Sequence, residues 1–442
     1  MQVSLKLINA KIFTRQTLLS AGLIIENGTI TKIAKEPNLP QAATTLNLNG
    51  QMVIPGVIDA HVHLRDFELA YKETFQTGTR AAAMGGVTTV LDMPNTRPAT
   101  TNPKRLLEKK QKARDNIFTN VGFFSGLPES IEDIKRLAKE KIAGFKIYPH
   151  YPISSIDLND DKLLLEFFKA ISTYDLPICI HPDTPKDNQT KKLHTIDEKE
   201  QIIDFLRTHD AKSEVQSIKR FCNLARVAKN KLHFCHVTTK QSLASIKEER
   251  RLNHNITCEV LPHHLLLSQD DLFKWKSWAK ILPPLRSQTE VNGLWEGLRN
   301  GDIDILASDH APHSLAEKST SFSKAPSGIP GVETLIPLMM TEVLRDRLSL
   351  NQFIMLTSER AAQIFNLGKN GKIEEGYTAN LTIINTRIRK KIDPDDFYSK
   401  SKLTPFKRWE VRAIPSMTIV NGQIVMQDGE IMESTRVGKI VP

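Results

Sequence analysis

The sequence predicts an α/β fold, a (β/α)8 TIM-like barrel with a small β-sandwich domain built from both chain termini. Three observations predict it. Short β-like runs alternate with helical patterns through the middle of the chain, the two ends have an all-β texture, and 442 residues suffice for one large domain and a smaller one. An open, doubly wound sheet is the alternative fold.

Eight strand-like runs are spaced along the central region. Amphipathic or alanine-rich stretches separate them, such as residues 72–84, 161–174 and 242–251, so each strand is expected to lead into a helix. Repeated βα units favour a closed parallel barrel over an open sheet. The predicted strands are residues 57–63, 87–93, 118–124, 144–148, 176–181, 231–237, 256–260 and 303–309.

The two ends of the chain are predicted to share one β domain. Strand-like pieces occur near both termini, and Asn27-Gly28 and Asn421-Gly422 each lie between β-formers as hairpin turns. Two separate domains of this size would be too small to bury a core. We therefore expect a composite β-sandwich domain of residues 1–54 and 368–442, and a catalytic barrel of residues 55–367.

The composition indicates an ordinary globular protein, with 40% hydrophobic and 25% charged residues. Four cysteines without a Cys-x-x-Cys pair suit a reducing cytosol, and we expect a cytoplasmic protein that does not enter the membrane. The net charge is +10, but the lysines are scattered through helix-like segments such as residues 104–112 and 131–141. We interpret them mostly as solvated helix faces, with no nucleic acid as partner, although a positive field favours anionic substrates.

A pair of histidines, His61 and His63, ends the first predicted barrel strand. Side chains alternate along a strand, so both imidazoles lie on one face and form half of a site for a transition metal. Arg65 adds a cation that can hold a carboxylate through two parallel hydrogen bonds. The alternative for Arg65 is a surface ion pair with Asp66 or Glu68.

Five further strands also deliver polar or titratable side chains to the end of the barrel where active sites lie. A single strand-end histidine is more often a hydrogen-bonded structural residue, but the coincidence favours a shared site. Four histidines and an aspartate exceed what one tetrahedral zinc needs, so two metals fit the count better. The additional strand-end residues are Asn95, Lys146, His181, His236 and Asp309.

Lys146 lies in the middle of an apolar predicted strand. A bare ammonium is costly there and cannot bind a metal. Reaction of the neutral amine with carbon dioxide would convert it into a carbamate, which can bridge two metals. Alternatively, Lys146 reaches solvent or pairs with Asp309 or Glu259, and the residues alone do not choose between these interpretations.

Several segments together carry a resemblance to a known family. The chain resembles the amidohydrolase superfamily over essentially its whole length, and within it the dihydroorotase type whose metals are bridged by a carboxylated lysine. The segments are Asp59-Ala-His-Val-His-Leu-Arg65, Gly85-Gly-Val-Thr-Thr-Val-Leu-Asp-Met-Pro-Asn-Thr96, Gly144-Phe-Lys-Ile-Tyr148, Cys235-His236, Cys258-Glu-Val-Leu-Pro-His-His-Leu265 and Ser308-Asp-His-Ala-Pro-His313.

The resemblance implies a centre of two Zn²⁺ ions per subunit with a bridging hydroxide and an N6-carboxylated Lys146. The ligands of the more buried metal would be His61, His63, Lys146 and Asp309, and those of the more exposed metal Lys146, His181 and His236. Asp309 would also be the general acid and base. The residues that would hold the carboxylate and ring of the substrate are Arg65, Asn95 and His313.

The implied activity is the reversible cyclisation of N-carbamoyl-L-aspartate to L-dihydroorotate with loss of water, a step of pyrimidine (UMP) biosynthesis. The expected binding partner is thus a small-molecule substrate. The resemblance is also compatible with a homodimer and with an association with aspartate transcarbamoylase. Cys235 and Glu259 could hold an additional metal with His61. The alternative is a hydrogen-bonded shell that orients His61 and His236.

Two other functions are compatible with the same motifs. Hydantoinase, dihydropyrimidinase and allantoinase share the metal core, but Asn95 and His313 favour a substrate with a free carboxylate. The second alternative is an inactive relative that serves as a structural partner of aspartate transcarbamoylase. Against it, all six metal-ligand positions hold residues that can bind a metal.

Three segments depart from the family pattern. Asp66-Phe67-Glu68 replaces a common Glu-Pro-Gly, so the loop beside the carboxylate site is expected to differ in shape. Leu282 stands where relatives carry a polar residue that contacts the substrate. Residues 149–155 occupy the place of a mobile lid, lack the threonine that some relatives use, and contain two prolines that imply stiffness.

Overall fold

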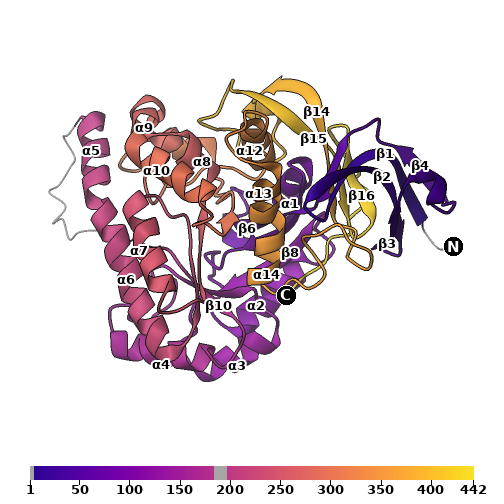
Figure 1. Ribbon diagram of the computed structural model, residues 1–442. Coiled ribbons are helices and arrows are strands. Elements are labelled where there is room, and N and C mark those ends of the chain that lie inside the picture. The colour runs from indigo at the N-terminus through magenta and orange to yellow at the C-terminus, as the bar shows by residue number, and fades with distance from the viewer. Residues whose placement is uncertain (1–3, 184–196) are drawn as a thin grey trace.

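Two β-sheets organise the protein, and the helices surround one of them (Figure 1). The computed structural model describes residues 4–183 and 197–442. The larger assembly is a parallel barrel enclosed by helices. The second sheet lies at one side of the barrel, near the N-terminus.

The barrel is an eight-stranded parallel sheet in the order β13-β12-β11-β10-β9-β8-β7-β6, so consecutive strands are neighbours. It closes between its first and last strands, because Val62 forms a parallel bridge with His310 and the His63 N–H donates to the His310 carbonyl at 2.8 Å. The predicted barrel is confirmed, and the alternative of an open, doubly wound sheet is wrong. The strands are β6 Val57–Val62, β7 Val87–Asp92, β8 Asn120–Ser125, β9 Gly144–Ile147, β10 Pro177–Ile180, β11 Lys231–Phe234, β12 Ile256–Val260 and β13 Ile305–Leu306.

Several of the helices that follow the strands begin at side chains that cap them. Thr74 and Thr77 form a reciprocal capping box at the start of α1, and Asp160 accepts the backbone N–H groups of the first turn of α4. The α-helices are α1 Phe75–Met84, α2 Pro103–Ala113, α3 Glu132–Lys139, α4 Asp161–Ile171, α5 Glu198–Thr208, α6 Ala211–Ala228, α7 Lys240–Arg250, α8 Pro262–Leu266, α9 Gln269–Trp275, α10 Gln288–Arg299, α11 Leu315–Lys318, α12 Leu335–Val343, α13 Leu350–Ile354 and α14 Arg360–Ile364. The 3-10 and π turns are η1 Glu36–Asn38, η2 Phe67–Leu69, η3 Lys276–Ala279, η4 Met355–Glu359 and η5 Pro394–Asp396.

The second sheet combines strands from both termini, as predicted. Its nine strands run in the order β17-β16-β15-β14-β5-β1-β2-β3, with β4 paired to β1, and β14 pairs with β5 to join the two ends of the chain. The exact domain boundaries stay a prediction. The strands are β1 Ser4–Thr14, β2 Thr17–Glu26, β3 Thr29–Ala34, β4 Thr44–Asn47, β5 Met52–Pro55, β14 Leu381–Lys391, β15 Glu410–Val420, β16 Gln423–Gln427 and β17 Glu430–Ile431.

Both predicted Asn-Gly turns are confirmed. Asn27-Gly28 connects β2 to β3, and Asn421-Gly422 connects β15 to β16. All four residues have positive φ, from 49° to 82°, which matches the right-handed twist of the flanking strands and explains why Asn and Gly occupy these positions.

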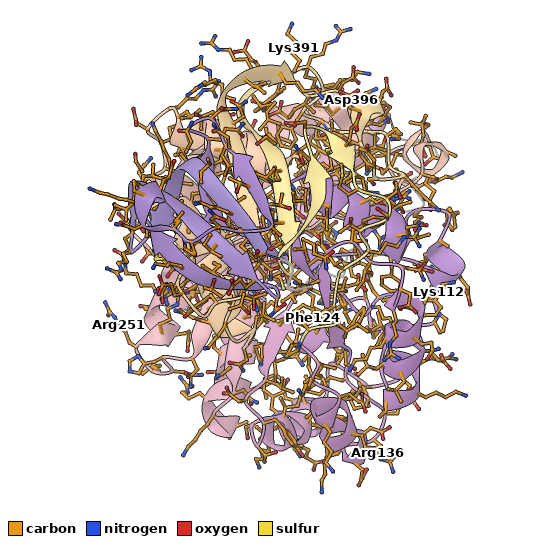
Figure 2. The ribbon with its side chains drawn as sticks, turned by 90° about the vertical axis from the view of Figure 1, so that its right-hand side faces the viewer. Lys112, Phe124, Arg136, Arg251, Lys391 and Asp396 are labelled. Atoms are coloured by element: carbon orange, nitrogen blue, oxygen red, sulfur yellow. The ribbon has the colours of Figure 1, made fainter. Side chains whose placement is uncertain are left out.

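Charged side chains mostly lie at the periphery, whereas aromatic ones fill the interior. Figure 2 shows Lys112, Arg136 and Arg251 pointing outward, while Phe124, which is buried, lies near the centre. The four cysteines are free and buried. Within residues 4–183 and 197–442, none of the helices has the length and apolar character needed to cross a membrane.

Lys109 on α2 is an exception to the prediction that this helix presents solvated lysines. Its side chain is fully buried, and its Nζ lies 2.7 Å from Oδ2 of Asp92 and donates to the Met93 carbonyl at 2.8 Å. Asp92 also accepts the Leu64 N–H at 2.7 Å. This ion pair therefore fastens α2 to the ends of β6 and β7, directly after the His61-x-His63 pair.

We predict that Lys109→Met lowers the free energy of unfolding by about 3 to 5 kcal/mol, because the Asp92 carboxylate would stay buried without its cation. Urea denaturation followed by circular dichroism measures this. Lys112→Met, on the exposed face of the same helix, is the control and should change stability by less than about 1 kcal/mol. Equal effects of the two substitutions would contradict the role of the buried pair.

Candidate active site

The barrel brings the four predicted strand-end histidines into one cluster. The ring centroids of His61 and His63 are 5.4 Å apart, those of His61 and His236 5.3 Å, and those of His181 and His236 4.6 Å. All four side chains are buried. Residues from β6 and from the ends of β10 and β11 therefore converge on one point at the carboxyl ends of the strands.

The backbone at this end of the barrel is strained in several places. Arg65, His236 and Asp309 have φ angles of 59°, 36° and 45°, which residues other than glycine rarely adopt. Such conformations persist only where the surrounding structure holds them, and they gather at functional sites. The three side chains are thereby turned out of the regular alternation of their strands.

Asp309 faces both histidines of the His-x-His pair. Its Oδ1 lies 3.1 Å from Nε2 of His63 and 3.4 Å from Nε2 of His61. Nδ1 of His63 donates to Oδ1 of Asn95 at 2.7 Å, and Nδ1 of His61 donates to Oε1 of Glu259. With the Nδ1 positions used as donors, the Nε2 atoms of both rings face Asp309, and in the neutral imidazoles these atoms would offer lone pairs to a metal.

The electrostatics of this cluster call for positive charge. Burial by itself would lower the pKa of His61, but the carboxylates of Glu259 and Asp309 raise it to about 10. Burial lowers the pKa of His63 to about 4. Burial would raise the pKa of Asp309, yet His61 and His63 hold it below its ordinary value. The carboxylates of Glu259 and Asp309 thus both favour a cation in this part of the barrel.

His181 and His236 form a second half of the cluster. Nδ1 of His181 lies 3.0 Å from Nε2 of His236, and the other ring nitrogen of each residue is buried without a hydrogen-bond partner among the described residues. Burial lowers the pKa of His181 to about 3 and that of His236 well below its ordinary value. Both imidazoles are therefore neutral, the form that binds metals.

These separations fit metal coordination. Two ligands on a tetrahedral zinc with bonds of roughly 2.0–2.1 Å are about 3.3 Å apart. The Asp309–His61, Asp309–His63 and His181–His236 separations of 3.4, 3.1 and 3.0 Å are close to that value. His61, His63 and Asp309 form one group whose ligand atoms converge, and His61, Cys235 and Glu259 form another. The donor set thus fits a metal cofactor.

Lys146 lies on β9 with its side chain buried and its Nζ donating to Sγ of Cys235 at 2.7 Å. Its charge lowers the pKa values of His61, His181 and His236, which places it among the three imidazoles. The alternative of an ion pair with Asp309 or Glu259 is not seen among the described contacts. Glu259 instead binds His61, and also His233 at 3.0 Å.

Arg65 contacts the segment that follows Asp309, rather than forming an ion pair with Asp66 or Glu68. Its Nε donates to the Pro312 carbonyl at 3.3 Å, and its second guanidinium nitrogen lies 3.3 Å from Nε2 of His313. Both side chains are buried, and burial lowers the pKa values of both. The structure therefore places these two predicted carboxylate-binding residues side by side, next to the histidine cluster.

Asn95 and Asp66 have local roles in this geometry. Asn95 uses its carbonyl oxygen to orient His63, which leaves its amide N–H groups for another acceptor. Asp66 accepts the N–H groups of Phe67 and Phe75 at 2.7 and 3.0 Å, and so holds the loop between β6 and α1. Residues 65–67 all have positive φ, in line with the expectation of an altered loop.

Two other departures from the family pattern are also located. Leu282 is half-buried in the segment between η3 and α10. Residues 149–155 form an irregular turn after β9 in which the Tyr151 side chain is 51% exposed.

Several residues near the cluster were not singled out by the sequence. Lys72 has its Nζ 3.1 Å from Nδ1 of His313 and 2.7 Å from Oε1 of Glu317. His263, at the start of α8, is buried, has an unpartnered Nε2, and has its pKa lowered to about 4 by burial. The only signal for His263 was its place in the Pro-His-His motif, and the turn that holds Lys72 carries no metal-ligand pattern.

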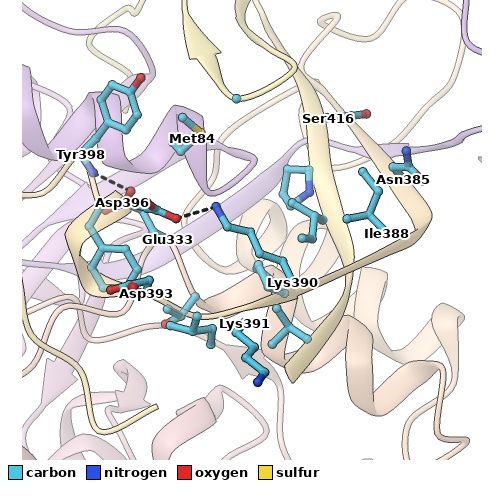
Figure 3. Close-up of a pocket in the computed structure, with 18 of the residues that line it drawn as sticks. Met84, Glu333, Asn385, Ile388, Lys390, Lys391, Asp393, Asp396, Tyr398 and Ser416 are labelled. Atoms are coloured by element: carbon cyan, nitrogen blue, oxygen red, sulfur yellow. Dashed lines mark hydrogen bonds and ion pairs between the residues drawn. The ribbon is translucent and has the colours of Figure 1, made fainter. Parts of the chain in front are cut away.

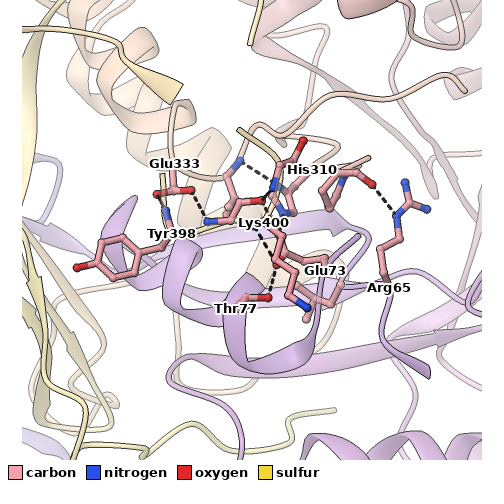
Figure 4. A network of polar contacts seen from close by, with 12 residues as sticks. Arg65, Glu73, Thr77, His310, Glu333, Tyr398 and Lys400 are labelled. Atoms are coloured by element: carbon pink, nitrogen blue, oxygen red, sulfur yellow. Dashed lines mark hydrogen bonds and ion pairs between the residues drawn. The ribbon is translucent and has the colours of Figure 1, made fainter. Parts of the chain in front are cut away.

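A polar network supports the Asp309–His313 segment from below (Figure 4). Glu73 accepts hydrogen bonds from the hydroxyls of Thr77 and Ser399, and its Oε2 lies 3.5 Å from Nε2 of His310. The Ser401 hydroxyl donates to the His313 carbonyl at 2.8 Å. A segment close to the C-terminal strands thus helps to position the site residues of the barrel.

A separate cavity of about 680 Å³ lies between α12, β14 and β15 (Figure 3). It is lined by apolar side chains together with Glu333, Lys390 and Asp396, and the last two form an ion pair at 2.8 Å. Burial raises the pKa of Glu333 to about 8, although its oxygens accept the N–H groups of Tyr398 and Ser399. The lining of this cavity contains none of the predicted site residues.

Comparisons with known proteins agree with this geometry. The profile of the Amidohydrolase family matches residues 52–425. A dihydroorotase from Methanosphaera stadtmanae is 36% identical over 415 residues, covering 92% of this chain and 94% of that protein. A dihydroorotase from Bacillus cytotoxicus is 34% identical over 417 residues, covering 93% and 95%.

Solved structures share the fold over the whole chain. The L-hydantoinase (dihydropyrimidinase) from Arthrobacter aurescens superimposes with a TM-score of 0.91 at 28% identity and covers 100% of both chains. The dihydropyrimidinase from Brevibacillus agri gives a TM-score of 0.88 at 22% identity, covering 99% and 98%. From these matches and the strand-end cluster, the chain belongs to the amidohydrolase family and is an enzyme of the hydrolase class.

Proposed function

We propose that this enzyme is a dihydroorotase, which interconverts N-carbamoyl-L-aspartate and L-dihydroorotate plus water in pyrimidine biosynthesis. The observation that carries the proposal is the buried pair of Arg65 and His313 beside the His61–Asp309 cluster. A buried guanidinium requires an anionic partner, and dihydroorotate keeps one free carboxylate on its ring. The similarity to dihydroorotases at 36% and 34% identity supports the same substrate.

We propose that the resident metals are two zinc ions. The buried metal would be held by His61, His63, Asp309 and Lys146, and the exposed one by Lys146, His181 and His236. When bound, such a pair polarises the amide carbonyl and lowers the pKa of water so that it can attack at neutral pH. The close separation of the facing ring nitrogens of His181 and His236, and of Asp309 from His61, supports this assignment.

The carboxylated form of Lys146 resolves an electrostatic conflict. An ammonium among three imidazoles would repel any cation that they bind. A carbamate on the same side chain is an anion, and it could bridge both metals. The burial of Lys146 and its lack of a carboxylate partner among the described contacts support this modification.

The protein groups divide the remaining tasks between them. Arg65 and His313 would bind the free carboxylate, and Asn95 would donate from its amide to the same end of the substrate. Asp309 would take a proton during hydrolysis and transfer it to the leaving nitrogen, and do the reverse during ring closure. In the direction of synthesis, the ureido nitrogen forms the new amide bond with the side-chain carboxyl group, and one water leaves.

A hydantoinase or dihydropyrimidinase is the second candidate, supported by the TM-score of 0.91 with the L-hydantoinase. Such substrates are uncharged rings and would leave Arg65 buried without an anion. Incubation of the purified enzyme with L-dihydroorotate, hydantoin, dihydrouracil and allantoin separates the two. We expect turnover of dihydroorotate above all; hydrolysis of the uncharged rings alone would refute the proposal.

We predict that Lys146→Ala abolishes activity and lowers the zinc content, with partial rescue by added acetate or propionate, because these anions can occupy the place of the carbamate. Metal analysis and steady-state assays measure both effects. Lys231→Ala, at a partly exposed lysine on β11 that pairs with Asp175, is the control and should keep full activity. An active, zinc-loaded Lys146→Ala enzyme would show that the lysine has only a packing role.

We predict that Arg65→Lys raises the KM for dihydroorotate by about tenfold to a hundredfold while zinc content stays unchanged, because lysine lacks the two-pronged geometry. Arg105→Lys, on the surface of α2, serves as the control. Loss of zinc from the Arg65 variant would place this residue in the metal site instead.

A further inference from the structure

The turn before α1 places a second buried cation beside the proposed carboxylate pocket. Lys72 is 9% exposed, and its Nζ lies 3.1 Å from Nδ1 of His313. An ammonium group has hydrogens to donate and no lone pair to accept with. Nδ1 of His313 must therefore be the acceptor, and the proton of the neutral imidazole lies on Nε2.

The other ring nitrogen of His313 faces two groups. It lies 3.0 Å from the Ser327 carbonyl, to which it can donate, and 3.3 Å from a guanidinium nitrogen of Arg65. Because Arg65 is also a donor, the two N–H groups cannot bond to each other, and an anion that reaches both would share the Nε2–H with the Ser327 carbonyl. A carboxylate, with its two oxygens, is suited to accept from both.

Lys72 is itself held firmly in place. Oε1 of Glu317 lies 2.7 Å from its Nζ, and the Tyr71 hydroxyl donates to the same carboxylate at 3.1 Å. Glu317 also closes the capping box of α11 with Ser314. The next residue, Glu73, is fixed by its contacts to Thr77 and Ser399, so Lys72 cannot easily move away from His313.

From this geometry we propose that Lys72 is a positioning residue, which keeps His313 in the Nε2-protonated tautomer so that His313 and Arg65 both donate to the substrate carboxylate. The proposal rests on the proposed dihydroorotase function for the identity of that anion. Burial, Arg65 and Lys72 all lower the pKa of His313, so the imidazole stays neutral. Arg65 and Lys72 each carry one positive charge, and Glu317 neutralises that of Lys72. The pocket therefore keeps one positive charge, which matches the single carboxylate of the substrate.

A purely structural role is the competing explanation, in which Lys72 only pairs with Glu317. That role would affect stability and all substrates equally. A positioning role affects the recognition of the carboxylate. The test therefore compares L-dihydroorotate with its carboxamide analogue, in which the free carboxylate is replaced by a neutral amide.

We predict that Lys72→Met lowers kcat/KM for dihydroorotate by about tenfold to a hundredfold, mainly through KM, because one charge-assisted hydrogen bond loses its geometry. For the carboxamide, the change should stay within about threefold. Lys72→Arg, which keeps a donor, should recover most of the lost selectivity. Lys240→Met removes an exposed lysine paired with Glu296 and is the matched control. Equal losses on both substrates, or an unchanged KM, would overturn the proposal.

A spectroscopic measurement tests the tautomer directly. In ¹⁵N-histidine NMR spectra of the metal-loaded wild-type enzyme, His313, identified by its absence in His313→Gln, should show a protonated Nε2 and a bare Nδ1. In Lys72→Met the Nδ1 signal should shift because its hydrogen bond to the ammonium is lost, and the preference for the Nε2 proton should weaken to what the Ser327 carbonyl alone maintains. A wild-type His313 protonated at Nδ1 refutes the proposal even if the variants do not fold. If the wild type converts no dihydroorotate, the proposed function fails, while the NMR result still decides the role of Lys72.

Discussion

The meeting of acceptor atoms around Asp309 is the constraint on which the rest of the site depends. Oδ1 of Asp309 lies 3.4 Å from Nε2 of His61 and 3.1 Å from Nε2 of His63, and Glu259 adds a buried carboxylate behind His61. Acceptor atoms at this distance repel one another unless a proton or a metal cation lies among them. The barrel can hold this arrangement because the strand ends and the strained backbone at Asp309 are supported by the surrounding core.

Buried lysines in this protein show how the partner determines what a cation can do. Lys109 has the carboxylate of Asp92 at 2.7 Å and stays a structural cation. Lys318 donates to three backbone carbonyls, at 2.9 to 3.2 Å, and shapes the segment that carries Ser327. Among the described residues, Nζ of Lys146 donates to the Cys235 thiol and lies 5.1 Å from the centre of the Tyr148 ring, and no carboxylate pairs with it. A chemical change that makes this side chain an anion would therefore remove the cost of a buried cation.

Two loops fold against each other beside the proposed carboxylate pocket. The turn before α1 carries Lys72 and Glu73, whose side chains reach His313 and His310 respectively. Ser399 and Ser401, which precede β15, add hydrogen bonds to Glu73 and to the His313 carbonyl. The histidine cluster is thus built by the barrel strands, whereas the proposed carboxylate pocket is also supported by residues from near the C-terminal strands.

Local patterns in the sequence predicted the barrel, the composite terminal sheet and the cluster of polar strand-end residues, because strand periodicity and Asn-Gly turns are local signals and parallel strands end on one face. The sequence could not reveal the burial of Lys109, the Lys72–His313 contact, or the Nε2 of His263 that has no hydrogen-bond partner among the described residues. These depend on which side chains meet across elements hundreds of residues apart, such as 72 and 313. Only the tertiary structure decided them, since hydrogen-bond partners and desolvation follow from packing rather than from spacing along the chain.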